Sequence, residues 1–137
     1  MAGKLNVAGA SLGLDAALGR ATVNSRTVYL ALLTAAPAQG TALSGLTEYA
    51  AAGYGRQAIA FVAPSGTPRV TSNTALLTYG PLTGANGSTS IGWWAVVSAA
   101  SGTTGDVVAY GDFTTARVPA VNDSLTVAAG AITVSVD

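Results

Sequence analysis

The sequence predicts an all-β protein, an antiparallel β-sandwich or jelly roll of seven to eight strands with a short N-terminal helix. The first reason is composition: 137 residues, 50% hydrophobic and 9% charged, suffice for one buried core. The second is that short β-forming segments recur along the chain between turn residues. No repeat of 20 to 50 residues is visible. We expect one domain over 1–137, with an arm and helix in 1–20 and the sandwich in 21–137.

The centre of the prediction is a hairpin in residues 91–113, which hold both tryptophans. Alternation puts Trp93 on one face of the first strand and Trp94 on the other, and both faces are largely apolar. This indicates either a central strand, or a strand with one face in the core and one against another chain. Small, turn-forming residues at 99–105 separate it from the returning strand at 107–113.

The other strands are predicted from β-forming residues bounded by breaks. Residues 26–34 are apolar on both faces and predict an inner strand that ends at Pro37. A last hairpin is expected around Gly130. The further strands that the pattern predicts are 55–62, 71–79, 124–128 and 131–136.

The N-terminus and the two long connections carry weaker patterns. Residues 1–10 predict an arm that orders only against a partner. Ser11 is the expected cap of a helix that stops at Gly19 and is weakened by Gly13. The connection 38–54 predicts a short helical turn, and Asn86-Gly87 marks a tight turn in the loop 80–90.

The charge and residue content exclude several classes of function. The charges of six basic and six acidic residues cancel, so the net charge gives no reason to expect binding to nucleic acid or to an anionic membrane. The chain has no cysteine, so it has no thiolate chemistry. It has no histidine either, and so lacks the commonest general base and the commonest metal ligand. No apolar run is long enough to span a bilayer, and the start lacks the apolar core of a signal peptide.

The candidate chemical groups form no motif. The six carboxylates are scattered, and Asp106 and Asp112 are expected about 20 Å apart, too far for a catalytic pair. The segment 53–56 is rich in glycine but precedes a strand and lacks the lysine of a phosphate-binding loop. We therefore expect no enzyme activity, no cofactor and no metal.

Aromatic and arginine side chains are the remaining candidates for binding. The tryptophans and several tyrosines suit a stacking platform for a sugar or a base, but such residues also fill cores and interfaces. Arginine suits ion pairs between subunits, although an isolated arginine is more often simply a surface charge. The residues predicted to lie at an interface are Tyr49, Tyr54, Arg56, Trp94 and Arg117.

Seven short segments occur in one order along nearly the whole chain: LDAAL at 14–18, VYLALLTAAP at 28–37, GYGRQAIAF at 53–61, SNT at 72–74, AASG at 99–102, VAYG at 108–111 and AAGAI at 128–132. Each segment is common by itself, but in their order and spacing they resemble a family of small virion proteins of tailed bacteriophages. The chain departs from the family at residues 38–52, where an Ala-rich loop replaces the usual Gly-rich, acidic one.

The resemblance implies a structural protein of the virion, assembled in the host cytoplasm. The first expectation is a decoration (cement) or minor capsid protein that binds the major capsid protein and copies of itself on the outer head. The alternative is a tail or tail-fibre component, bound to tail proteins and in contact with the host surface. A hydrolase or lectin unrelated to phages has little support from these residues.

Overall fold

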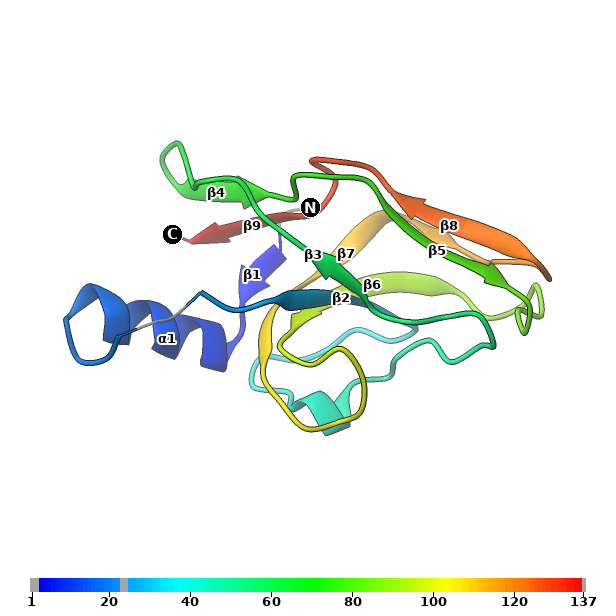
Figure 1. Cartoon of the computed structure of the whole chain (residues 1–137), viewed down its shortest axis with the longest axis horizontal. Helices are drawn as coiled ribbons and strands as arrows, with labels where there is room; N and C mark the ends of the chain where they lie inside the picture. The colour runs from blue at the N-terminus through cyan, green and yellow to red at the C-terminus, as the bar shows by residue number, and fades with distance from the viewer. Residues whose placement is uncertain (1–2, 23–24, 137) are drawn as a thin grey trace.

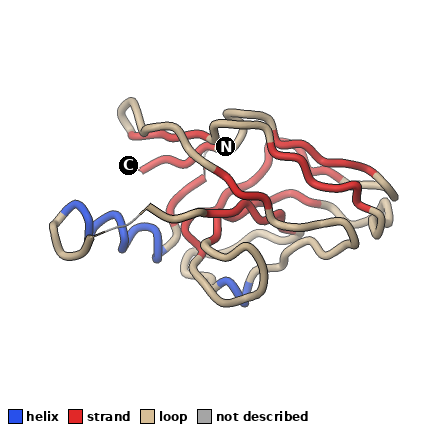
Figure 2. Tube along the Cα trace, in the orientation of Figure 1, coloured by secondary structure: helices blue, strands red, loops and turns tan. Residues whose placement is uncertain are grey.

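The computed structural model describes residues 3–22 and 25–136 and confirms the all-β fold with a short N-terminal helix (Figure 1). Within these residues there are nine strands, where seven to eight were predicted. Most of them form one curled sheet of seven strands, in the order β3-β2-β6-β7-β1-β9-β4. The other two, β5 and β8, form a separate ribbon. Figure 2 shows the helix projecting from one end of this body.

The predicted central hairpin is present as β6 (Ile91–Val97) and β7 (Val107–Arg117). The inner strand predicted at 26–34 is β2 (Val28–Leu33), which pairs with β6 over five residues. Its other edge pairs with β3 (Gln57–Ile59). Both faces of β2 and β6 are largely buried within the chain itself. Of the two alternatives for the strand at 91–97, the central strand is therefore the one observed.

The inner face of the sheet packs against the ribbon of β5 (Leu77–Leu82) and β8 (Asp123–Val127). The core between these layers includes Leu30, Leu32, Tyr79 and Trp94, each at most 2% exposed. The outer face is covered by the connection after β2. There the short 3-10 helix η1 (Leu43–Gly45), in a segment predicted to make a helical turn, buries Leu43 against β2, β6 and β7.

The N-terminal arm was predicted wrongly, because Gly3–Leu5 form β1 inside the sheet. This strand pairs antiparallel with β7 and parallel with β9 (Thr133–Val136), so the sheet is mixed and not wholly antiparallel. Its position requires a glycine. A Cβ on Gly3 would lie 2.1 Å from the indole of Trp94, so only glycine permits this contact.

The helix α1 (Val7–Ala17) begins four residues before the predicted cap, Ser11. Its N-cap is Asn6, whose side chain does not cap the helix. Instead, Asn6 Nδ2 donates to the carbonyl of Thr41 (3.1 Å), and its Oδ1 accepts from the amide of Gly40 (2.7 Å). Asn6 therefore ties the start of the helix to the connection 38–54.

The predicted hairpin around Gly130 is also wrong. β8 pairs with β5, whereas β9 pairs with β1 and with β4 (Arg69–Ser72). Gly130 makes a turn, with a φ of 79°, but the turn carries the chain from the ribbon into the seven-stranded sheet. The segment predicted as one strand at 71–79 is divided between β4 and β5, and Asn73 lies between them.

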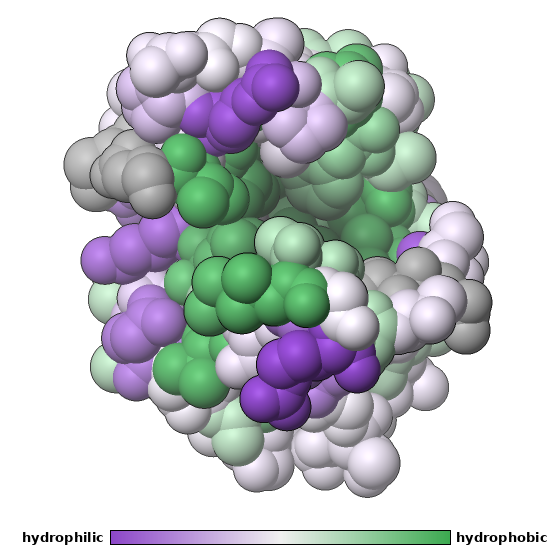
Figure 3. Space-filling model, turned by 90° about the vertical axis from the view of Figure 1, so that its left-hand side faces the viewer, coloured by the Kyte–Doolittle hydropathy of each residue, from purple (hydrophilic) through white to green (hydrophobic). Residues whose placement is uncertain are grey.

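One end of the molecule exposes apolar side chains around a hollow (Figure 3). The helix α1 and its C-cap carry three exposed apolar side chains, Val7, Leu14 and Leu18, which are 53 to 70% exposed. Among the helical residues only Gly9 is buried. In the parts of the chain that the structure describes, no helix is both long and apolar enough to cross a membrane.

Candidate functional site

Three of the five predicted interface residues lie together, but they surround a residue that was not predicted. Glu48 lies beside β2, where it forms an isolated bridge with Leu33. Arg56 Nε and Nη2 donate to the two carboxylate oxygens of Glu48 at 2.9 and 2.7 Å. The Tyr54 hydroxyl also donates to Glu48, at 2.6 Å, and accepts from the amide of Leu32 at 3.0 Å.

Arg56 extends this network to the loop between β6 and β7. Its Nη1 donates to the carbonyl of Ala99 (2.9 Å), and its Nη2 donates to that of Gly102 (2.8 Å). The guanidinium thus joins the segment 48–56 to the loop 99–102. We call Glu48, Tyr54 and Arg56 the Arg56 clamp. The side chains of Arg56 and Glu48 are 5% and 22% exposed, so this ion pair is largely removed from water.

Aromatic rings pack beneath the clamp. Tyr54 stacks on Tyr79 with ring centroids 5.9 Å apart, and Tyr49 meets Tyr54 edge-on at 5.7 Å. Tyr79 is fully buried and donates its hydroxyl to the carbonyl of Leu30 (2.9 Å). Burial, and for Tyr54 also the hydrogen bond to Glu48, raises the pKa of both phenols above the usual value of 10. Both phenols therefore stay protonated at neutral pH and act as hydrogen-bond donors.

The interactions of the clamp serve to hold the structure together. The hydrogen bond to Glu48 raises the pKa of Arg56, so the guanidinium keeps its charge. Among the described residues, no buried polar side-chain atom is left without a hydrogen bond. Each charged group of the clamp is therefore already paired inside the chain, which suits a rigid support for the adjoining loops. A shallow groove of about 390 Å³ runs beside the clamp, lined by residues of 48–56 and 100–102.

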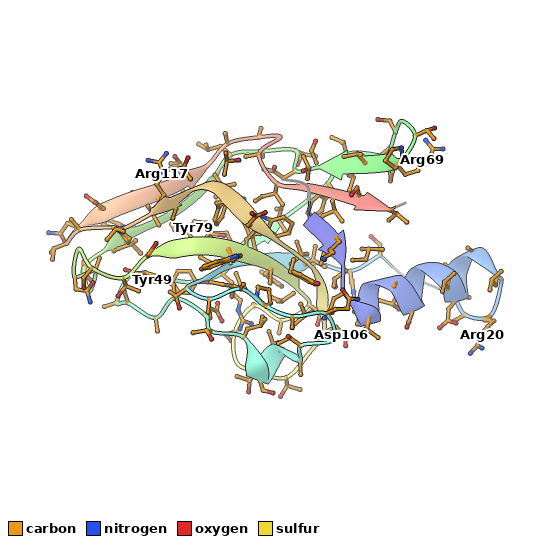
Figure 4. All side chains as sticks on the ribbon, turned by 180° about the vertical axis from the view of Figure 1, so that it is seen from behind. Arg20, Tyr49, Arg69, Tyr79, Asp106 and Arg117 are labelled. Atoms are coloured by element: carbon orange, nitrogen blue, oxygen red, sulfur yellow. The ribbon has the colours of Figure 1, made fainter. Side chains whose placement is uncertain are left out.

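The other two predicted interface residues lie elsewhere. Trp94 is 1% exposed, and its indole rests on Gly3 and Gly111 while Nε1 donates to the carbonyl of Asp112 (3.3 Å). It belongs to the core and offers no side-chain surface to a partner. Arg117 is exposed at the end of β7, and in the view of Figure 4 Tyr79 lies between it and Tyr49. Glu48 was missed because a lone carboxylate in a loop gives no signal in the sequence.

A larger cleft, of about 700 Å³, opens between β7 and β8. Its lining combines apolar residues such as Ile91 and Phe113 with hydroxyl side chains such as Thr115 and Thr126. The carboxylates Asp112 and Asp123 and the cation Arg117 also line it. In the described ranges, 3–22 and 25–136, no three metal-ligating side chains of Asp, Glu, His or Cys come together.

Comparison with known families gives a match along almost the whole chain. The model of a family described as "Podophage GP4 fiber I protein gp80" matches residues 8–135. This range contains every residue of the Arg56 clamp and the whole β7–β8 cleft. A comparison with curated proteins gives no match.

Proposed function

The chain belongs to the podophage GP4 fiber I protein gp80 family of phage structural proteins, and from this membership we propose that it is a building block of a phage tail fibre. The observation that carries the proposal is the match of the fibre family over residues 8–135. It favours the tail-fibre alternative drawn from the sequence over the first expectation, decoration of the head.

The proposed role is mechanical and involves no catalysis. Its support is a body whose buried polar side chains are satisfied internally and whose largest loop is fixed by a mostly buried ion pair. Such a body holds its shape while its surfaces contact neighbours. We propose that copies of this chain and other tail proteins are those neighbours, and that they meet in the host cytoplasm during assembly.

The contact surfaces in this proposal are those that the fold leaves open. The groove beside the Arg56 clamp is lined by the predicted group Tyr49, Tyr54 and Arg56. Because Tyr49 is 4% exposed and the side chain of Arg56 is 5% exposed, most of the open surface comes from the neighbouring residues of 50–55 and 100–102. Arg117 is exposed and lines the β7–β8 cleft. Trp94 is not part of these surfaces, because it is enclosed in the core.

Deleting the gene from a phage that encodes this chain tests the proposal. We expect particles with intact, filled heads that lack one set of tail fibres in negative-stain micrographs and regain it on complementation. Head stability is the informative control, because a cement protein protects the shell against heat and chelator. Particles that keep all fibres but have fragile heads would contradict the proposal and support capsid decoration instead.

A further inference from the structure

The second half of β7 lacks the cover that the first half has. Val107, Ala109 and Tyr110 are buried, but Thr114, Thr115, Ala116 and Arg117 are all exposed. An internal strand of a two-layered fold normally buries at least one face. On its outer edge β7 pairs with β1 only at Ala109 and Tyr110, so no described strand continues that pairing toward Arg117.

The strand β8 faces the same cleft with an open edge. It pairs with β5 on one side, and no described strand pairs with the other. Leu125 and Val127 face the core, whereas Ser124 and Thr126 are exposed. Backbone N–H and C=O groups along an open edge need a hydrogen-bonding partner, and natural proteins usually obstruct such edges.

Other edges of this fold are obstructed, which sets β8 apart. The outer side of β4 is bonded to the preceding segment, because Val62 N donates to Ser72 O and Ser65 exchanges two bonds with Val70. The strand β5 is broken by a bulge that contains Pro81, which has no amide hydrogen. The free edge of β8 has no proline, lysine or bulge.

The topology leaves this side of the fold open, whereas the opposite side is in contact. On one side of the fold, β3 at the edge of the curled sheet lies against β5 of the ribbon. On the opposite side, β7 and β8 are joined by the short turn 118–122 yet do not pair. A strand added along the edge of β8 would lie in the cleft beside β7, where the pairing of β7 with β6 is itself irregular between Asp112 and Arg117.

We propose that the β7–β8 cleft is a binding site for an extended segment of another polypeptide, which adds to the fold as a strand along the edge of β8. Strand addition takes its affinity from main-chain hydrogen bonds and its specificity from alternate side chains. The segment would place apolar side chains toward Phe113 and Ile91 and polar ones outward beside Thr126. The donor is a separate chain, because the described β-forming segments of this chain already lie in its own sheets.

The test uses the isolated protein and a synthetic peptide. The probe is an eight-residue peptide of alternating threonine and valine with a lysine at each end. NMR titration of the labelled protein should give saturable shifts confined to the amides of 113–117 and 124–127. A peptide with the same side chains but N-methylated on alternate amides should not bind, because it cannot form the ladder. Equal binding of both peptides, or no binding of either, would overturn the proposal.

Two neighbouring substitutions on β7 provide the matched protein control. Thr115 lines the cleft, whereas Ala116 does not and lies near Gly92 instead. Thr115→Trp should fill the cleft and weaken binding of the peptide by roughly tenfold or more, while Ala116→Trp should leave binding unchanged. Equal effects of the two variants would contradict the site. The peptide test needs no phage particle, so its failure would leave the assignment to a fibre standing.

Discussion

Removing Arg56 is the sharpest test of the clamp. In Arg56→Met the carboxylate of Glu48 keeps only the hydroxyl of Tyr54, and the carbonyls of Ala99 and Gly102 lose their donor. Breaking a buried ion pair on one side destabilises a protein by about 3–5 kcal/mol. Because Glu48 is 22% exposed, water screens part of the loss. We therefore expect about 2–4 kcal/mol, a large share of the stability of a typical domain.

Urea unfolding followed by tryptophan fluorescence measures this loss as a lower midpoint at unchanged slope. Arg26→Met is the control, because Arg26 pairs with Asp106 at 3.2 Å but the side chains are 37% and 50% exposed. That variant should lose less than about 1 kcal/mol. Glu48→Gln added to Arg56→Met should restore part of the stability, since it removes the unpaired charge. Similar losses for Arg56→Met and Arg26→Met would refute the reasoning.

Two further predictions concern packing and pH. Gly111→Ala should cost about 1–3 kcal/mol, since a Cβ there would lie 2.5 Å from the indole of Trp94. Gly13→Ala should instead stabilise by up to about 1 kcal/mol, because the helical Gly13 has open space around it; thermal unfolding that ranks the two alike would contradict this. Burial raises the pKa of Tyr54 and Tyr79, so the folded state holds two protons that the unfolded state releases near pH 10. The contribution of these two tyrosines to stability should thus be constant below pH 10 and fall above it by about 1.4 kcal/mol per pH unit for each tyrosine, with the slope reduced in Tyr79→Phe; urea midpoints that stay level from pH 9 to 11 would disprove it.

The sequence predicts those elements that have a strong local pattern. The hairpin of β6 and β7 and the inner strand β2 have apolar residues on both faces and clear turns beside them. Local pattern does not determine distant pairing, which is why β8 and β9 were expected to pair with each other across Gly130. Strand β1 has only three residues, too few to show an alternating pattern, and its place depends on the distant indole of Trp94.

The candidate site was predicted only in part, for a related reason. The residue types suggested that aromatic and arginine side chains form an interface, and Tyr49, Tyr54 and Arg56 do lie together. Whether an aromatic residue faces outward depends on the opposing layer, and for Trp94 that layer is the core. The β7–β8 cleft could not be predicted from local pattern, because it arises where two consecutive strands fail to pair.

Cryo-electron microscopy of a tailed phage particle that carries this chain tests the central claim most directly. The account predicts that the curled seven-stranded sheet and its two-stranded ribbon fit density in a fibre attached to the tail. It also predicts one additional strand along the free edge of β8. Finding the chain only on the outer surface of the head would contradict its place in a fibre.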